Sequence, residues 1–158
     1  MTKQIMIKSG EFGEFTKVIN VVVQEAWYSI EQCRANPRSI YVFGDNLLRV
    51  GEAGQASIRS CNNAIGIATK KKPSMLDSSF FSDKEYDMLE PFLKKEMDKI
   101  VSIMFSDNID TLVFPKDGLG TGLSKLPQKA PKVFLALSAL LYKTFGIVTD
   151  QKTYKLSI

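Results

Sequence analysis

Histidine is absent from the 158 residues of this chain, and cysteine occurs only twice, at Cys33 and Cys61. Without histidine, the chain cannot form the Ser-His-Asp or Cys-His arrangements of nucleophilic enzymes. A structural zinc site usually takes four Cys or His ligands, so we expect no metal site, and nothing in the sequence indicates a bound cofactor. Any general acid or base must therefore be Asp, Glu, Lys, Tyr or Cys.

Long apolar runs are also missing from the sequence. None approaches the roughly 20 residues that a membrane-spanning helix needs. The opening residues, MTKQIMIKSGEFGEF, lack the apolar centre of a signal peptide. We therefore expect a cytoplasmic protein without a membrane partner.

Positive charge exceeds negative charge only slightly. The chain has 21 Lys and Arg against 17 Asp and Glu, which gives a net charge of +4. This balance is far from the dense basic stripes of nucleic-acid-binding proteins, and it suits a small anionic ligand at least as well. The tightest cationic cluster is Lys70-Lys71-Lys72. A solvated loop is its simplest interpretation, and a phosphate contact is the alternative.

Length and composition predict one domain that covers residues 1–158. No internal repeat or low-complexity linker divides the chain, and its 44% hydrophobic and 24% charged residues are ordinary for a globular domain. A chain of this length buries about two-thirds of its unfolded surface, so it needs neither disulfides nor a metal to fold.

Strands alternate with helices along the chain. Short apolar runs predict strands at residues 3–9, 39–45, 64–69, 110–115, 146–150 and 153–158. Helical patterns cover residues 16–36, a short stretch around 55–64, 83–107, and 126–146, where Gly146 ends the helix. This order is typical of an α/β sandwich with a largely parallel central sheet.

The segment 16–36 is predicted to be an amphipathic helix with Thr16 as its N-cap. Pro37 follows its end, as expected after a helix stop. One stripe of this helix would hold Val18, Val22, Ala26, Ile30 and Cys33. The run VINVVV (18–23), taken alone, could equally form a strand.

The segment 83–107 is predicted to be a long amphipathic helix capped by Ser82 or Asp83. Pro91 lies within the pattern, so the helix should begin near it or kink there. The apolar face would hold Met88, Phe92, Met97, Ile100, Val101 and Met104.

Two glycine-rich loops follow predicted strands. The first loop, residues 44–55 (GDNLLRVGEAGQ), begins at the end of the strand at 39–45, and the second loop, residues 117–124 (DGLGTGLS), follows the strand at 110–115. In open α/β sheets, ligands bind outside the carboxyl ends of the strands, so both loops can meet at one site. Backbone N–H groups of a glycine loop can point inward together and bind an anion, and a following helix start adds its positive dipole end. The pattern therefore indicates a diphosphate site.

Neither loop matches the two best-known phosphate-binding motifs. The chain contains no GxxxxGK[ST] string, and the glycines at 118, 120 and 122 form GxGxG rather than GxGxxG. The sequence thus supports neither a P-loop kinase nor a dinucleotide-dependent dehydrogenase. Glycines that only make tight turns are the alternative interpretation.

Both loop segments are similar to the ligand loops of macro domains. DGLGTGLSKLPQKAPKVFLAL resembles their second ligand loop, in which a small-residue turn precedes a proline and an alanine-rich helix. VFGDNLLRVGEAGQASIRSCNNAIGIATKKKP resembles their first ligand loop, which follows a strand ending in Gly-Asp or Gly-Asn. The resemblance covers residues 39–145 and looks closest to a divergent branch that is frequent in bacteriophage and bacterial genomes.

The resemblance implies a three-layer α/β/α sandwich with a mixed, largely parallel central sheet, and it implies that ADP-ribose or a related NAD-derived nucleotide binds across the strand ends. In and near the first loop, it implies ligand-binding roles for Gly44, Asn46, Gly51, Ala53, Gly54, Gln55 and Lys71. The second loop would cradle the diphosphate with its backbone. There the resemblance implies roles for Gly118, Leu119, Gly120, Thr121, Gly122, Leu123 and Ser124.

Some macro domains hydrolyse ADP-ribosyl bonds and others only bind, and the resemblance leaves both open. One hydrolytic subclass uses a lysine that attacks the ribose, and AIGIATKKKPS offers Lys70 or Lys71 for this role. That subclass also has an acidic residue after the glycine loop, where this chain has Ser124, and a serine cannot replace a carboxylate as general acid or base. Asp45 and Asp117 are the remaining candidate carboxylates, although either could instead shape its own turn.

Three functions follow from these observations. The first is an ADP-ribosyl hydrolase that acts on protein, nucleic-acid or small-molecule adducts. The second is a non-catalytic module that reads or sequesters an NAD-derived nucleotide, phage-encoded and directed against signalling in the host cytoplasm. The third is a mildly basic interaction protein whose glycine loops are structural.

Overall fold

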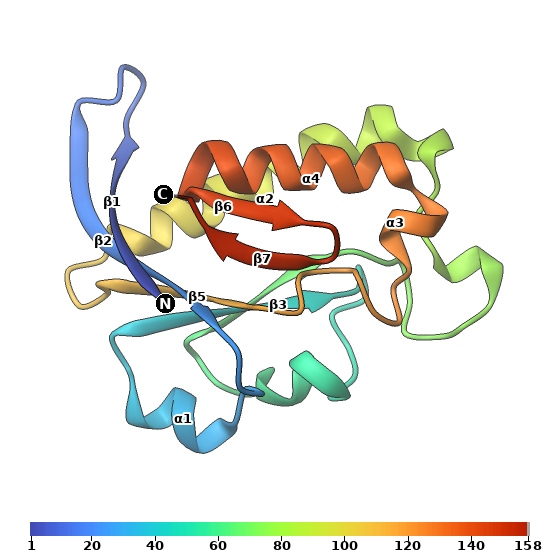
Figure 1. Ribbon diagram of the computed structural model, residues 1–158, viewed down its shortest axis with the longest axis horizontal. Coiled ribbons are helices and arrows are strands. Elements are labelled where there is room, and N and C mark those ends of the chain that lie inside the picture. Colours follow the sequence, from blue (N-terminus) through green and yellow to red (C-terminus); the bar gives the residue numbers. More distant parts are fainter. Residues whose placement is uncertain (158) are drawn as a thin grey trace.

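The computed structural model describes residues 1–157 and contains a mixed five-stranded sheet with the strand order β1-β2-β5-β3-β4 (Figure 1). Its strands are β1 (Thr2–Ser9), β2 (Phe15–Gln24), β3 (Ser39–Asp45), β4 (Ala64–Ala68) and β5 (Thr111–Pro115). β1 pairs antiparallel with β2, whereas the β2–β5, β5–β3 and β3–β4 pairs are parallel. The predicted α/β fold with a mixed, largely parallel sheet is therefore confirmed.

The helices and a separate hairpin cover this sheet. The helices are α1 (Ile30–Ala35), α2 (Tyr86–Met104), α3 (Leu126–Lys129) and α4 (Pro131–Phe145), with short 3₁₀ segments η1 (Gly54–Ile58), η2 (Asp77–Ser79) and η3 (Asp83–Glu85). β6 (Ile147–Asp150) and β7 (Thr153–Leu156) form a two-stranded antiparallel sheet. α2 and α4 lie side by side on one side of the large sheet, with the hairpin next to α4, and α1 lies on the other side (Figure 1).

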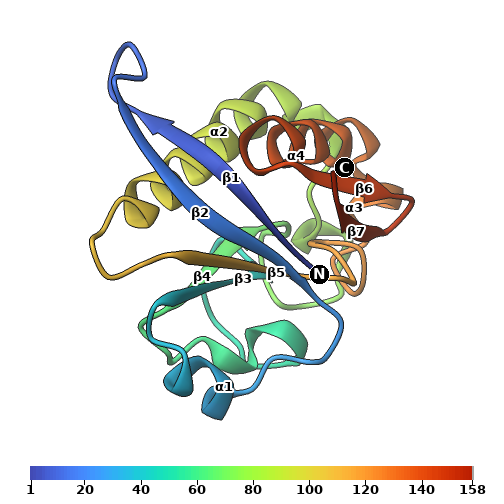
Figure 2. The ribbon, with the colours of Figure 1, turned by 60° about the vertical axis from the view of Figure 1, so that its left-hand side comes forward.

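The predicted helix at 16–36 is wrong up to residue 29, and the strand alternative for 18–23 is right. Residues 15–24 form β2, which makes a long hairpin with β1 (Figure 2). Ile19, Val21 and Val23 are buried, whereas Val18 is 54% exposed. Burial of every second residue is the period of a strand, and β-branched side chains favour it. The helix begins only at Ile30, where the Ser29 hydroxyl, and not Thr16, accepts a hydrogen bond from the Gln32 N–H.

The long helix at 83–107 is confirmed in its main part as α2, preceded by η3. Ser82 is its cap, within a capping box that Glu85 completes. Pro91 lies inside α2, which already begins at Tyr86. The buried face consists of Leu89, Leu93, Glu96, Met97, Ile100 and Met104. Met88 was predicted on that face but is 58% exposed, because the stripe passes through its neighbour Leu89 instead.

The predicted helix at 126–146 is interrupted. α3 ends at Lys129 and α4 begins at Pro131. Proline has no backbone N–H to continue a helix, but its fixed φ suits the first position of a new one. Gly146 ends α4 with a left-handed φ of 71°, as predicted. The expected strand at 153–158 is β7 up to Leu156, and residue 158 lies outside the described residues. None of the helices in residues 1–157 has the length and apolarity to cross a membrane.

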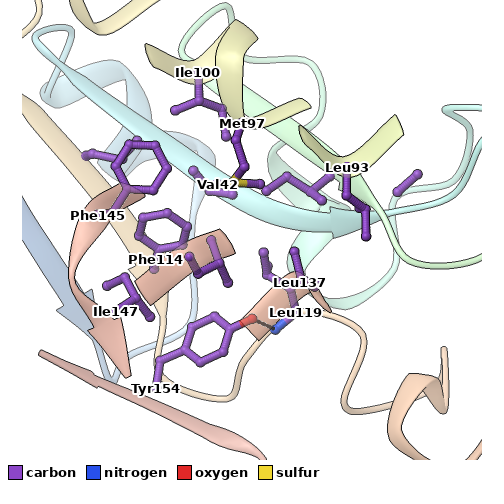
Figure 3. Close-up of a cluster of buried hydrophobic side chains, with 14 of the residues drawn as sticks. Val42, Leu93, Met97, Ile100, Phe114, Leu119, Leu137, Phe145, Ile147 and Tyr154 are labelled. Carbon is purple, nitrogen blue, oxygen red and sulfur yellow. Dashed lines mark hydrogen bonds between the residues drawn. The ribbon is translucent and has the colours of Figure 1, made fainter. Parts of the chain in front are cut away.

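Two clusters of buried side chains hold the layers together. The larger cluster joins the sheet to α2, α4 and the hairpin, and it includes Val42, Leu93, Met97, Ile100, Phe114, Leu137, Phe145 and Tyr154 (Figure 3). The smaller cluster lies at α1 and η1 and includes Tyr28, Cys33, Tyr41, Phe43, Ile58 and Cys61. β3 and β5 are covered on both faces and are therefore almost entirely apolar. Their carboxyl ends are fixed at one edge of the sheet, where both glycine loops begin.

Candidate functional site

A cavity of about 560 Å³ lies between the two glycine loops at the carboxyl ends of β3 and β5. All the predicted site residues except Lys71 and Leu119 line it. The residues that sequence reasoning missed are Trp27, Val50, Ala56, Arg59, Pro73, Lys152 and Thr153. The expectation that the two loops meet at one site is therefore confirmed.

The second loop owes its path to glycines with left-handed backbone. Gly118 and Gly120 have φ values of 85° and 74°, which other residues rarely adopt. A Cβ at Gly120 would lie 2.9 Å from Cβ of Thr69, and one at Gly118 would lie 2.6 Å from the Lys152 carbonyl oxygen. Gly122 differs, because its φ is not positive and a Cβ there meets nothing within 4 Å. Two of the three glycines are thus required by geometry.

Both walls of the cavity carry backbone donors without partners. The N–H groups of residues 120–124 in the second loop have no acceptor among residues 1–157. The same holds for the N–H groups of residues 50–54 in the first loop, within the same described part of the chain. Successive free N–H groups bordering a cavity are suited to binding an anion. They give the site an electropositive lining that does not depend on side chains.

Leu119 and Lys71 do not take part in this lining. Leu119 is fully buried, and its N–H donates to the hydroxyl of Tyr154 at 3.0 Å (Figure 3). That N–H is therefore not available to a ligand. The Lys71 ammonium lies 3.0 Å from a carboxylate oxygen of Glu85. Lys71 and Leu119 are therefore the two predicted site residues that do not line the cavity.

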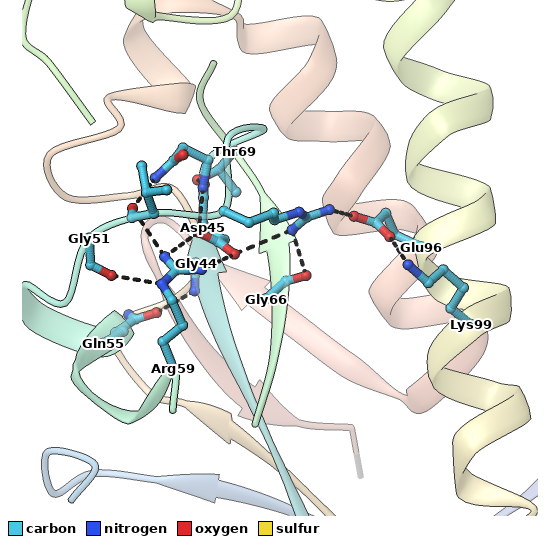
Figure 4. A network of polar contacts seen from close by, with 12 residues as sticks. Gly44, Asp45, Gly51, Gln55, Arg59, Gly66, Thr69, Glu96 and Lys99 are labelled. Carbon is cyan, nitrogen blue, oxygen red and sulfur yellow. Dashed lines mark hydrogen bonds and ion pairs between the residues drawn. The ribbon is translucent and has the colours of Figure 1, made fainter. Parts of the chain in front are cut away.

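Asp45 is the centre of an ion network that holds the first loop (Figure 4). Its side chain is 2% exposed, and its two oxygens accept from Nη1 and Nη2 of Arg59 at 2.8 and 2.6 Å. The Asn46 N–H also donates to this carboxylate at 2.8 Å, and Arg49 approaches it at 3.4 Å. The bonds to Asp45 raise the pKa of Arg59. A carboxylate bound in this way is a structural counter-charge rather than a free acid or base.

Arg59 and Arg49 extend the network in two directions. Arg59 donates to the carbonyl oxygens of Gly51 and Val50 in the first loop, at 2.7 and 3.2 Å. Arg49 donates to the Gly66 carbonyl oxygen at 2.9 Å and pairs with Glu96 of α2. A Cβ at Gly66 would overlap the Asp45 carboxylate, so this strand position has to be glycine. The first loop is thereby connected to the sheet and to α2.

Two side-chain contacts connect the elements around the cavity. The Gln55 amide accepts from the Gly44 N–H and donates to the Gly118 carbonyl, both at 2.9 Å, and so joins the two loops; we call the part of the cavity beside it the Gln55 end. The Thr69 hydroxyl, just after β4, lies 3.0 Å from the Ser124 hydroxyl of the second loop, and we call the part beside Ser124 the Ser124 end. Trp27 and Asp117 lie at the Gln55 end, because they line a small adjacent cavity together with Gln55. The Asn46 side-chain amide donates to the Val50 carbonyl. Gln55 and Asn46 thus use their side chains to hold the loops in position.

Lys70 lies next to Thr69, at the Ser124 end of the cavity, and is 5% exposed. Its ammonium lies 3.5 Å from the Met75 sulfur and 4.6 Å from the Phe80 ring centroid. No carboxylate among residues 1–157 lies within 4.0 Å of it. Burial, and then the charge of Lys125, lower the pKa of Lys70. Its ammonium therefore has no carboxylate counter-charge within the described residues.

Asp117 is the second carboxylate that lines the cavity within the described residues. It is exposed, and its backbone carbonyl accepts from the Thr121 hydroxyl. It also lines the small adjacent cavity together with Trp27 and Gln55, whereas Lys70 does not. The cavity lining thus includes Lys70 and Asp117, which have no ion-pair partner among residues 1–157.

Comparisons with known proteins place the chain in a family without assigning it an activity. A search of curated proteins found no match, and a search of solved structures found none. One family model matches residues 23–140, a range that includes both glycine loops, the buried lysine and most of the sheet. The chain therefore belongs to the DUF7831 family, which is described as a family of unknown function.

Proposed function

We propose that this protein binds ADP-ribose or a related NAD-derived nucleotide in the cavity between the two glycine loops. The observation that carries this proposal is the pair of unpartnered N–H runs, residues 50–54 and 120–124, on facing walls of one cavity. A diphosphate offers acceptor oxygens in two directions, which suits donors on two walls. The helices on both sides of the mixed sheet also agree with the three-layer sandwich of macro domains.

The size and ends of the cavity favour a whole nucleotide over a free phosphate. A volume of about 560 Å³ is typical of sites for small organic ligands. Trp27 is 73% exposed beside the Gln55 end, where its indole can stack on a base. The donor runs would then hold the diphosphate, and the far sugar would lie towards Lys70.

Binding is better supported than hydrolysis. A lysine mechanism would need Lys70 as nucleophile and a nearby group that protonates the leaving adduct. Asp45 is held by two arginines, Asp117 lies beside Trp27 and Gln55, and Ser124 occupies the place of the expected acid. We therefore favour a module that sequesters or reads the nucleotide, as a phage-encoded protein acting in the host cytoplasm would. Hydrolysis is the second candidate, and the lowered pKa of Lys70 in the cavity lining supports it.

The direct test is thermal stabilisation of the whole chain by ADP-ribose, cyclic ADP-ribose and AMP. A ligand that binds only the folded state at 100 times its Kd adds about 2.7 kcal/mol to the free energy of unfolding. Gly122→Leu adds a side chain at the cavity wall where a Cβ meets no atom, so it should keep the melting temperature and weaken binding about tenfold or more. If none of these nucleotides shifts the melting temperature at millimolar concentration, the proposal fails.

Binding and hydrolysis can then be separated with an ADP-ribosylated peptide and an ADP-ribosylated oligonucleotide. Release of ADP-ribose that disappears in Lys70→Gln, while this variant still binds ADP-ribose, would establish the hydrolase. Binding without turnover of either substrate would establish the sequestering module.

A further inference from the structure

Three ammonium groups lie around one buried aromatic ring near the Ser124 end of the cavity, and of the three lysines Lys70 lines the cavity itself. The Nζ atoms of Lys70, Lys129 and Lys125 lie 4.6, 5.1 and 6.0 Å from the centroid of the Phe80 ring, which is 4% exposed. Each cation gains from the negative face of the ring. The three positive charges also repel one another, so a negative counter-charge would stabilise the cluster.

Carboxylates around the ring neutralise little of this charge. Lys129 lies 3.4 Å from Asp77, but the Asp77 side chain is 97% exposed, and such a surface pair is weak. The Glu85 carboxylate is already paired with Lys71. Neither Lys70 nor Lys125 has a carboxylate within 4.0 Å in the described part of the chain. An excess of positive charge therefore remains at this end of the cavity.

Lys70 is the least satisfied member of the cluster. It is buried, and its only polar neighbour within hydrogen-bonding distance among residues 1–157 is the Met75 sulfur, a weak acceptor. Burying an amine without a strong partner is unfavourable. Because Lys70 also lines the cavity, a bound anion can reach it from inside. Lys125 follows Ser124 directly, so the cluster continues from the donor run at residues 120–124.

We propose that Lys70, Lys125 and Lys129 form a second oxyanion site, which takes a phosphate or carboxylate group lying beyond the diphosphate in the bound molecule. The inference rests on the proposed function only for the position of the diphosphate. It narrows the ligand to a nucleotide whose sugar end carries a further negative charge. An adduct with a neutral or cationic group at that end would gain nothing from these lysines.

The experiment titrates inorganic phosphate, and separately acetate, into the full chain while NMR follows the lysine Nζ groups. We expect phosphate to shift the Lys70, Lys125 and Lys129 signals in a saturable way and to raise the pKa of Lys70, since a bound anion favours its charged form. The acetate titration distinguishes a site for phosphate groups from one that also takes carboxylate groups. A response to phosphate alone selects a phosphate group, and a response to both extends the site to carboxylates.

Variants locate the bound anion. Lys125→Gln and Lys129→Gln each remove one exposed charge and should weaken phosphate binding about three- to fivefold. Lys132→Gln is the matched control, because Lys132 lies on neighbouring α4 with its Nζ 4.6 Å from the Tyr86 ring instead. This control should leave phosphate affinity unchanged. If the double variant Lys125→Gln/Lys129→Gln binds phosphate as tightly as the unaltered chain, the second site does not exist.

The outcome separates this inference from the proposed function. If ADP-ribose fails to bind but phosphate binds in a lysine-dependent way, the nucleotide assignment is wrong and the oxyanion site stands. If ADP-ribose binds and neither phosphate nor acetate perturbs the three lysines, the oxyanion site is wrong and the nucleotide assignment stands.

Discussion

The two walls of the cavity are built by different means. The first loop is held by charged and polar side chains, with Asp45 and Arg59 at the centre and Gln55 at the end. The second loop has few side-chain bonds and instead depends on glycines at positions where any side chain would collide with Thr69 or Lys152. Ion pairs and hydrogen bonds hold the first wall, whereas the second wall needs glycines because its backbone packs too closely for side chains.

This difference determines how each wall can fail. Removing the Asp45 charge from the first wall leaves two partly buried arginines without their shared carboxylate, which is costly because they are incompletely hydrated. Adding one methyl group at Gly118 or Gly120 of the second wall forces apart surfaces that are in contact, and it also strains a left-handed backbone. Both walls nevertheless have the same feature, a run of N–H groups without a partner among residues 1–157.

Asp45→Asn should have the largest effect. The substitution leaves Arg59 and Arg49 without their shared counter-charge, and breaking a buried ion pair from one side typically costs about 3–5 kcal/mol. Urea denaturation measures this loss in the free energy of unfolding. Asp117→Asn, an exposed carboxylate of the same cavity, should change stability by less than about 0.5 kcal/mol. Similar small losses in both variants would mean that the first wall does not depend on its ions.

Gly120→Ala should be the next most damaging change. A left-handed φ of 74° and a contact of 2.9 Å with Thr69 together predict a loss of about 2–3 kcal/mol. Gly122→Ala is the matched control, since its Cβ meets nothing within 4 Å, and it should stay within about 0.5 kcal/mol. Thermal unfolding of both proteins checks the difference. Equal stabilities would show that the second wall tolerates side chains after all.

Gln55→Ala removes the bridge between the walls and should have an intermediate effect. Two hydrogen bonds to backbone groups are lost, with a cost of about 1–2 kcal/mol in stability. Because the loops then move independently, affinity for ADP-ribose should also fall, which calorimetry measures. Gln32→Ala also loses two hydrogen bonds, both with Gln24, and neither joins the two loops, so it provides the control. An unchanged affinity in Gln55→Ala would argue that the walls are positioned separately.

Trp27→Ala should have the smallest effect on stability, below about 0.5 kcal/mol, because the indole is 73% exposed. Its effect on affinity for ADP-ribose should be about three- to tenfold, since a stacking partner for the base is lost. Trp27 is the single tryptophan of the chain, so its fluorescence reports binding directly. Trp27→Phe should retain most of the affinity. Tight binding without any change in fluorescence would place the base elsewhere.

The sequence was most informative where the signal is local. Glycines at 118 and 120 after an apolar strand predict a tight loop, and such a loop is present. The choice between Lys70 and Lys71 was not open to sequence reasoning, because the two are adjacent in the bend after β4 and the sequence does not show which side chain turns to the cavity. Only burial and the Glu85 pair distinguish the two lysines. The extended pattern at residues 18–23 was ambiguous for a similar reason, since a short apolar run fits a strand or a buried helix.

Long-range partners explain the remaining differences. Arg59 pairs with Asp45 across 14 positions, and no spacing rule connects an arginine just after a 3₁₀ segment to a strand end. The resemblance assigned Leu119 to the ligand loop, yet the hydroxyl of Tyr154, 35 positions away, accepts the hydrogen bond of its N–H. Contacts of this kind arise when the chain folds back on itself, so the sequence pattern does not report them.

The β6–β7 hairpin contacts the second loop through Tyr154, which does not line the cavity. Tyr154 donates its N–H to the Lys116 carbonyl and holds Leu119 through its hydroxyl, while the ring packs near Phe114. A change in this hairpin would therefore tilt the second loop without altering any residue that a ligand touches. In related proteins, selection for a different ligand can act through these back positions, so conserved cavity residues alone need not imply a shared ligand.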